Sequence, residues 1–238
     1  MEVKLLNMKT AVVTGASSGI GLEISKKLIE MNYKVYGFGR DFSKAKIDNP
    51  NFIKQVCDIT DVNRLCEVIR RIKNENDICL LVNNAGVGYF GPHEELNPKK
   101  IHDMVSTNLE IPMILSSILL RDLKKNKGTI INISSVTAKD ISTYGCAYSA
   151  TKAGLSHFSE SLFSEVRKTG VKVVCIHPDM TKSNFYRNAN FSEDDTESDF
   201  YIRSEIIGDL VKSIVTQSPD VVITDITIRP QKHRIKRK

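Results

Sequence analysis

The feature of this sequence that most restricts its fold is a glycine-rich turn between a short apolar strand and a helix. Residues 10–14 (TAVVT) are largely apolar and β-branched, which predicts a buried strand. Residues 15–21 then read GASSGIG, and a helical apolar pattern begins at Leu22. Glycines allow a tight turn, and a helix N-terminus presents free N–H groups to an anion. The stretch therefore predicts a phosphate cradle, although a purely structural turn would use the same residue types.

The rest of the chain alternates predicted strands and helices. Further strands are expected at 34–38, 51–57, 78–82, 129–133, 171–176 and 221–228, and helices at 62–73, 99–125, 148–168 and 204–217. This alternation is typical of a parallel sheet with helices on both faces. We therefore expect a single α/β domain over residues 1–238, with a doubly wound, Rossmann-like sheet of about seven strands.

Charge and composition exclude several classes of protein. The net charge is +6, and the segment 229–238 contains six basic residues and no acidic ones, so the remainder has no net charge. A basic body for binding nucleic acid is therefore not expected, and 229–238 is interpreted as a solvated tail or as a contact for a subunit or an anionic ligand. No apolar run is long enough to span a membrane, and the N-terminal residues lack the regions of a signal peptide.

The cysteines favour a reducing compartment. The five cysteines are scattered, with no CxxC pair and no metal-ligand spacing among them or the five histidines. These observations favour a cytoplasmic protein with reduced thiols and no metal site.

Tyr148 and Lys152 are the candidate catalytic pair. A spacing of four residues places both side chains on one face of a helix. A nearby ammonium favours the phenolate and so lowers the pKa of a tyrosine, which makes it useful as a proton donor or acceptor near neutral pH. The alternative is an ordinary pair on a solvated helix face.

Several motifs together resemble the short-chain dehydrogenase/reductase family. They are TGASSGIG at 14–21, NNAG at 83–86, and YSATK at 148–152. Ser135 lies thirteen residues before Tyr148, which is the family spacing. The resemblance covers residues 9 to about 183 and implies hydride transfer between a nicotinamide cofactor and a carbonyl or alcohol carbon. It also implies a homodimer or homotetramer.

The resemblance assigns roles to residues of this chain. Ser135 is expected to orient the carbonyl oxygen, Tyr148 to exchange the proton, and Lys152 to lower the tyrosine pKa and hold the nicotinamide ribose. Asn108 is expected to bend the helix 99–125 and to hold a water of a proton relay. The cofactor is expected to contact Gly15, Ser17, Ser18, Gly19, Ile20, Gly21, Arg40, Asp58, Ile59, Asn83, Ala85, Gly86, Tyr148, Lys152, Pro178, Thr181 and Ser183. Asp58 could equally cap the helix 62–73.

NADP(H) is expected in preference to NAD(H). An acid after the second strand would bind the ribose hydroxyls and repel a 2′-phosphate, but this chain has Gly39 followed by Arg40 there. Two residues argue against a preference for NADP(H). Asp41 follows directly, and Ser18 takes a position that is often basic in NADP-dependent members. A surface loop without influence on the cofactor is the alternative.

The substrate side is expected to come from three variable segments. These are 87–98, with Tyr89, Phe90 and His93 as candidates, 137–147, with Tyr144, and an acidic lid at 184–203. His93 could equally be a surface histidine, and the lid could be a linker without function. Asp179 stands where the family usually has glycine, and Ser183 where it has threonine. A cofactor-binding redox sensor on the same fold is the alternative to an enzyme, but such proteins commonly lose the tyrosine or the lysine.

Overall fold

The computed structural model describes residues 8–237. Residues 1–7 of the N-terminal segment and Lys238 of the basic segment lie outside the described residues. Seven parallel strands form one sheet in the order β10-β6-β5-β4-β1-β2-β3. They are β1 (Thr10–Thr14), β2 (Lys34–Gly39), β3 (Phe52–Val56), β4 (Ile78–Asn83), β5 (Thr129–Ile133), β6 (Lys172–Pro178) and β10 (Asp225–Ile228). The predicted doubly wound sheet is confirmed.

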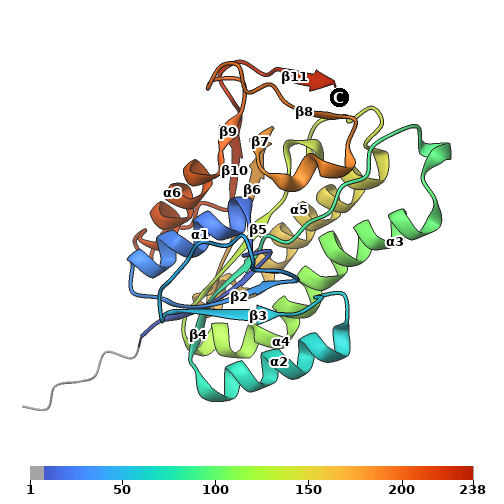
Figure 1. The fold of residues 1–238 in the computed structure, drawn as a ribbon. Coiled ribbons are helices and arrows are strands. Elements are labelled where there is room, and N and C mark those ends of the chain that lie inside the picture. Colours follow the sequence, from blue (N-terminus) through green and yellow to red (C-terminus); the bar gives the residue numbers. More distant parts are fainter. Residues whose placement is uncertain (1–7, 238) are drawn as a thin grey trace, which may run out of the picture.

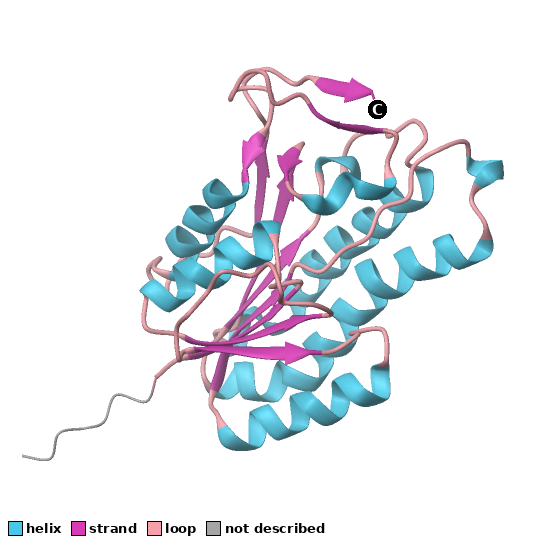
Figure 2. Cartoon of the chain, viewed as in Figure 1, coloured by secondary structure: helices cyan, strands magenta, loops and turns pink. Residues whose placement is uncertain are grey.

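Helices cover both faces of this sheet (Figure 1; Figure 2). They are α1 (Gly19–Glu30), α2 (Val62–Glu75), α3 (Pro98–Val105), α4 (Ile111–Lys125), α5 (Cys146–Val166) and α6 (Ser204–Val215). One apolar core contains Ile24 and Leu28 of α1 with Ile207 and Val211 of α6. The other contains residues of α2, α4 and α5, among them Leu115. Two separate cores, one on each face, are the physical reason that the central strands are buried on both sides.

The strand order places the functional region. The chain runs outward from β1 through β2 to β3, and then returns to β4 on the other side of β1. Ligands of such sheets bind at the carboxyl ends of the strands where the direction reverses. The segments that follow β1 and β4 are the glycine turn and the NNAG motif, so both meet at this point.

Several predicted boundaries differ from the structure. The last strand begins at Asp225 rather than at 221, and β6 continues to Pro178. The helix expected at 99–125 is interrupted by a π-helical turn at Ser106–Glu110. The flanking residues Val105 and Ile111 have helical torsion angles, so the chain is helical on both sides of this turn.

Two small sheets lie beyond the carboxyl ends of the strands. In one, β7 (Thr181–Lys182) pairs with β9 (Ile202–Arg203), and in the other β8 (Phe191–Glu193) pairs with β11 (Ile235–Arg237). The segment 184–203 therefore carries a 3-10 helix, Asn184–Asn188, and short strands. Across the described residues, none of the helices has the length and apolar character that crossing a bilayer requires.

Candidate active site

The glycine turn has the geometry of a phosphate cradle. Gly15 and Gly19 have φ angles of +66° and +53°, which other residues rarely adopt. A Cβ atom on Gly15 would lie 2.8 Å from the Asn84 side chain, so the turn packs tightly against the segment after β4. Ser18 precedes α1 without a side-chain cap, and the first turn of α1 holds no acid. Its N–H groups and positive dipole therefore remain available to an anion, which fits a dinucleotide.

A network around Thr14 joins this turn to the NNAG motif. The Thr14 hydroxyl oxygen accepts hydrogen bonds from the backbone N–H groups of Asn84 and Ala85, both at 3.0 Å. The Asn84 side chain donates to the carbonyl oxygen of Thr14 at 2.9 Å. Asn84 is a residue for which the sequence predicted no role, and its part in fixing the turn depends on contacts about 70 residues apart.

A cavity of about 510 Å³ opens from this turn across the carboxyl ends of the strands. Most residues predicted to bind the cofactor line it: Gly15, Ser17, Ser18, Gly19, Ile20, Arg40, Asp58, Ile59, Ala85, Gly86, Tyr148, Lys152, Pro178, Thr181 and Ser183. Gly21, Asn83 and Asn108 are not among the lining residues. Gly21 packs behind the turn, where a Cβ atom would lie 2.3 Å from the carbonyl oxygen of Gly15.

Asn83 connects neighbouring elements rather than reaching the cavity. Its side chain donates to Asn132 Oδ1 at 2.8 Å, and Asn132 donates to Ser159 Oγ at 2.8 Å. This buried chain crosses β4, β5 and α5. Asn83 therefore links neighbouring strands, and the same chain of hydrogen bonds fixes the helix that carries Tyr148.

The region after β2 has one basic side chain at the cavity. Arg40 lines it, whereas both carboxylate oxygens of Asp41 accept hydrogen bonds from Ser43 at 2.8 Å. A side chain at Gly39 would meet Ser17 Oγ at 3.0 Å, so the structure leaves little room for an acid at that position.

Asp58 forms a local turn and does not cap a helix. Its Oδ1 atom accepts from the backbone and hydroxyl of Thr60 at 3.0 and 2.8 Å. These hydrogen bonds, with the nearby Arg40 guanidinium, lower the pKa of Asp58. Asp61 caps α2 instead, by accepting from the backbone N–H of Arg64 at 3.0 Å. The capping alternative for Asp58 is therefore wrong.

Asn108 lies in the π-helical turn and is fully buried. Its side chain accepts from the N–H of Val87 and donates to the carbonyl oxygen of Val87, both at 2.9 Å. It also donates to Thr151 Oγ1 at 3.0 Å. The predicted irregularity of the helix is present, and the side chain joins the loop after β4 to the helix of Tyr148.

Ser135, Tyr148 and Lys152 converge at one edge of the cavity. Ser135 follows β5, and its Oγ atom accepts from Thr137 Oγ1 at 3.0 Å. Lys152 is 3% exposed and donates to the carbonyl oxygen of Ile133 at 2.8 Å. Its Nζ atom lies 5.9 Å from the centre of the Tyr148 ring.

The protonation of the pair differs from the sequence prediction. Burial raises the pKa of Tyr148, and a hydrogen bond with Ser135 opposes this shift. Burial also lowers the pKa of Lys152 to about 8. The expected lowering of the Tyr148 pKa by Lys152 is therefore not found, because the loss of solvent around the phenol dominates.

His177 is a residue near the site that the sequence did not single out. It is fully buried on β6, and its Nδ1 atom lies 3.2 Å from the carbonyl oxygen of Ser135. Its Nε2 atom lies 2.8 Å from Asp225 Oδ2 on β10. The imidazole thus braces the backbone of Ser135 against the edge strand of the sheet.

A second cavity, of about 600 Å³, adjoins the first, and Ser135 and Tyr148 line both. Phe90 and Phe185 pack on Tyr148 with ring centres 5.3 and 5.5 Å away. Tyr144 lines the second cavity and Tyr89 the first, as expected, but His93 lines neither.

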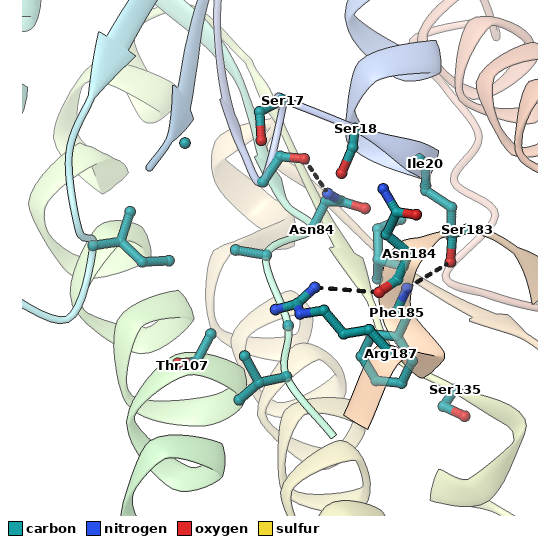
Figure 3. A pocket seen from close by; sticks show the side chains of 18 of the residues that line it. Ser17, Ser18, Ile20, Asn84, Thr107, Ser135, Ser183, Asn184, Phe185 and Arg187 are labelled. Carbon is teal, nitrogen blue, oxygen red and sulfur yellow. Dashed lines mark hydrogen bonds between the residues drawn. The ribbon is translucent and has the colours of Figure 1, made fainter. Parts of the chain in front are cut away.

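Residues of the segment 184–203 also line the first cavity, and Figure 3 shows Asn184, Phe185 and Arg187 at it. Arg187 Nη1 donates to the carbonyl oxygen of Asn184 at 3.2 Å. The sequence predicted that this segment covers the site, but no local signal singled out Asn184 or Arg187, because only the path of the segment across the cavity brings them there.

The family model described as short chain dehydrogenase matches residues 9–194. This chain belongs to the short-chain dehydrogenase/reductase family. Members are oxidoreductases, so the chain is an oxidoreductase of this family. The site described above thus lies in a short-chain dehydrogenase/reductase, as the motifs indicated.

Relatives of this short-chain dehydrogenase/reductase agree with that assignment. A probable short-chain type dehydrogenase/reductase VdlC of Helicobacter pylori is 34% identical over 195 residues, covering 80% of this chain and 71% of the relative. The 3-oxoacyl-[acyl-carrier-protein] reductase FabG of Buchnera aphidicola is 32% identical over 191 residues, covering 78% of each.

Solved structures share the fold. An alcohol dehydrogenase of Thermococcus sibiricus complexed with 5-hydroxy-NADP superposes with a TM-score of 0.83 at 22% identity, covering 96% of this chain and 99% of the other. A metagenomic short-chain oxidoreductase in complex with NADP gives a TM-score of 0.78 at 28% identity, covering 94% and 98%.

Proposed function

We propose that this protein interconverts a carbonyl and an alcohol, with NADP(H) as the preferred cofactor. The observation that carries the proposal is the position of Ser135 and Tyr148, which line both cavities, with Lys152 buried beside them. One cavity holds the glycine turn that fits a dinucleotide, and the other has several aromatic side chains in its walls, among them Phe90 and Phe191. A carbonyl group at their junction can contact the serine and tyrosine hydroxyls together.

The bound nicotinamide would supply the hydride chemistry, and the residues of this chain would handle the proton. Since burial raises the pKa of Tyr148, its phenol is protonated at neutral pH and can donate a proton to a carbonyl oxygen. Ser135 donates a hydrogen bond to the same oxygen as charge develops there. In the oxidative direction Tyr148 accepts the proton.

Lys152 stabilises the phenolate that remains after proton transfer. Its pKa of about 8 leaves the ammonium mostly charged at pH 7. Asn108 holds Val87 and Thr151 in place and thereby positions the helix that carries Tyr148 and Lys152. We assign Asn108 as a positioning residue. The proposal also includes a proton relay through a water held by the Asn108 backbone.

Preference for NADP(H) rests on Arg40. Its guanidinium is the charged group after β2 that lines the cavity, while Asp41 is engaged by Ser43. A guanidinium suits the 2′-phosphate, which a carboxylate at Gly39 would repel.

Oxidation of NADPH with a panel of ketones and aldehydes tests the proposal. Turnover should occur with at least one compound, with a higher kcat/KM for NADPH than for NADH. Tyr148→Phe should lower kcat by roughly a hundredfold or more, because it removes the proton donor, while leaving the Kd for NADPH nearly unchanged. Tyr201→Phe, outside both cavities, is the matched control. If the protein binds the cofactor but turns over no carbonyl compound, the proposed enzyme activity is refuted and a cofactor-binding redox sensor is favoured.

A further inference from the structure

The basic segment at the end of the chain is folded onto the molecule. Its strand β11 pairs with β8 in antiparallel register, with Ile235 opposite Glu193 and Arg237 opposite Phe191. Figure 1 shows this two-stranded unit beyond the carboxyl ends of the central strands. The described part of 229–238 is mostly exposed to solvent, as the solvated-tail interpretation predicts, but it is paired with the lid rather than free.

Opposite charges hold this segment against the acidic lid. Arg234 lies 3.2 Å from Asp194, and Lys232 lies 2.9 Å from Asp199 and 3.5 Å from Glu197. The basic side chains of these pairs are exposed, and such pairs are individually weak, at about 1 kcal/mol or less. Together with the strand pairing, they fix the position of the segment along the lid.

Asp179 gives the segment a further attachment outside the lid. This residue departs from the usual family glycine, and its side chain is 12% exposed. It lies 3.5 Å from Arg229 and 3.7 Å from His233. The Arg229 guanidinium thus compensates the carboxylate, and the His233 imidazole lies beside it.

Successive side chains of an extended segment point to opposite sides, and this alternation determines which of them face the second cavity. His233, Ile235 and Arg237 line it, at intervals of two residues, whereas Arg234 and Lys236 do not. The cavity also contains Phe90 and Phe191.

Arg237 is the unpaired charge of this cavity. It has no ion pair with any residue in the range 8–237, whereas His233 faces Asp179. The other charged side chain that lines the cavity, Asp179, is compensated as described. A guanidinium that forms no ion pair within the described range, beside an aromatic cavity, is suited to bind a carboxylate through two hydrogen bonds.

We propose that the C-terminal strand is a wall of the substrate site and that Arg237 selects carbonyl substrates bearing an anionic group, most simply a carboxylate. This inference rests on the proposed function, since the second cavity is the substrate site only if the protein reduces or forms a carbonyl. Aromatic walls hold the carbon skeleton, Ser135 and Tyr148 contact the carbonyl oxygen, and Arg237 binds the distal anion.

Kinetics with a keto acid and its methyl ester test the selectivity. The full-length wild-type protein should give a higher kcat/KM for the acid. Arg237→Gln should reduce the acid-to-ester ratio of kcat/KM roughly ten- to a hundredfold, because a hydrogen bond to a charged group is lost. Lys236→Gln removes the same charge from the neighbouring residue, which does not line the cavity, and should change the ratio less than about twofold. Equal ratios for both variants would overturn the inference.

A binding measurement separates this inference from the proposed function. Hexanoate and hexanamide are titrated into the NADP-loaded protein, with the thermal midpoint as readout. Hexanoate should raise the midpoint more than hexanamide, and Arg237→Gln but not Lys236→Gln should abolish the difference. If no carbonyl compound is turned over but hexanoate still stabilises the protein more than hexanamide, the proposed enzyme activity is refuted and the anion site is not. If carbonyl compounds are turned over but hexanoate and hexanamide have equal effects, the anion site is refuted and the enzyme activity is not.

Discussion

Replacing Lys152 by methionine should stabilise the protein at pH 7, although it removes a group of the proposed active site. Burial lowers the pKa of Lys152 from 10.5 to about 8. Each pKa unit corresponds to about 1.4 kcal/mol, so keeping the ammonium buried at pH 7 costs about 3 kcal/mol of folding free energy. Methionine retains most of the apolar stem but leaves the Ile133 carbonyl oxygen without its donor, a loss of about 1 kcal/mol. The net gain should be about 2 kcal/mol.

The dependence on pH makes this prediction specific. Because the folded-state pKa of Lys152 lies below the unfolded value, the unfolded chain binds more protons between pH 8 and 10.5. This contribution therefore raises the stability of the wild-type protein as pH increases through that range. The advantage of Lys152→Met should shrink by about 2.5 kcal/mol from pH 7 to pH 10.

Urea unfolding of both proteins at pH 7, 8, 9 and 10 measures this difference. Titration of the other buried groups, Tyr148 among them, occurs in both proteins and largely cancels. Lys168→Met, at an exposed lysine, is the matched control and should show no such trend. A variant that is less stable than wild type at pH 7, or a stability difference independent of pH, would refute the reasoning.

Two further predictions concern positioning and cofactor choice. Asn108→Ala leaves three hydrogen bonds without their partner, so it should cost roughly 2–4 kcal/mol and lower the Tm by roughly 5–15 °C. Calorimetry compares the Tm of Asn108→Ala with that of the control Asn74→Ala, which changes an exposed helical position. Equal Tm values for the two variants would contradict the prediction. Arg40→Glu should shift the ratio of kcat/KM for NADPH to that for NADH at least about tenfold toward NADH. Arg70→Glu, outside both cavities, should leave the ratio unchanged; an unchanged ratio in the Arg40 variant would exclude a role for its charge.

The parts of the site that sequence predicted are those fixed by local geometry. The turn at Gly15 follows from glycine torsion angles, and the Tyr148–Lys152 pair follows from helical spacing. The parallel direction of the central strands follows from their alternation with helices. The roles of the cofactor-binding and catalytic residues stay predictions, as does the homodimer or homotetramer.

The features that sequence did not reveal depend on packing between distant segments. The raised pKa of Tyr148 comes from its burial beneath Phe90 and Phe185, which lie on two segments far apart in the chain. Asp58 and Asp61 both fit a helix-capping pattern, and only the backbone path decides between them. The pairing of β11 with β8 joins residues more than 40 positions apart, beyond the reach of any local signal.

The two cavities draw on different parts of the chain. Every residue of the second cavity lies at or after Phe90, whereas the first also uses the glycine turn and the loops after β2 and β3. Tyr148 and Ser135 belong to both. Thr181, Ser183 and Asn184 follow β6 and line the first cavity, so recombination that exchanges the segments after β6 would change the walls of both cavities. Exchange of the chain before Phe90 would change the first cavity alone and leave the lining of the second intact.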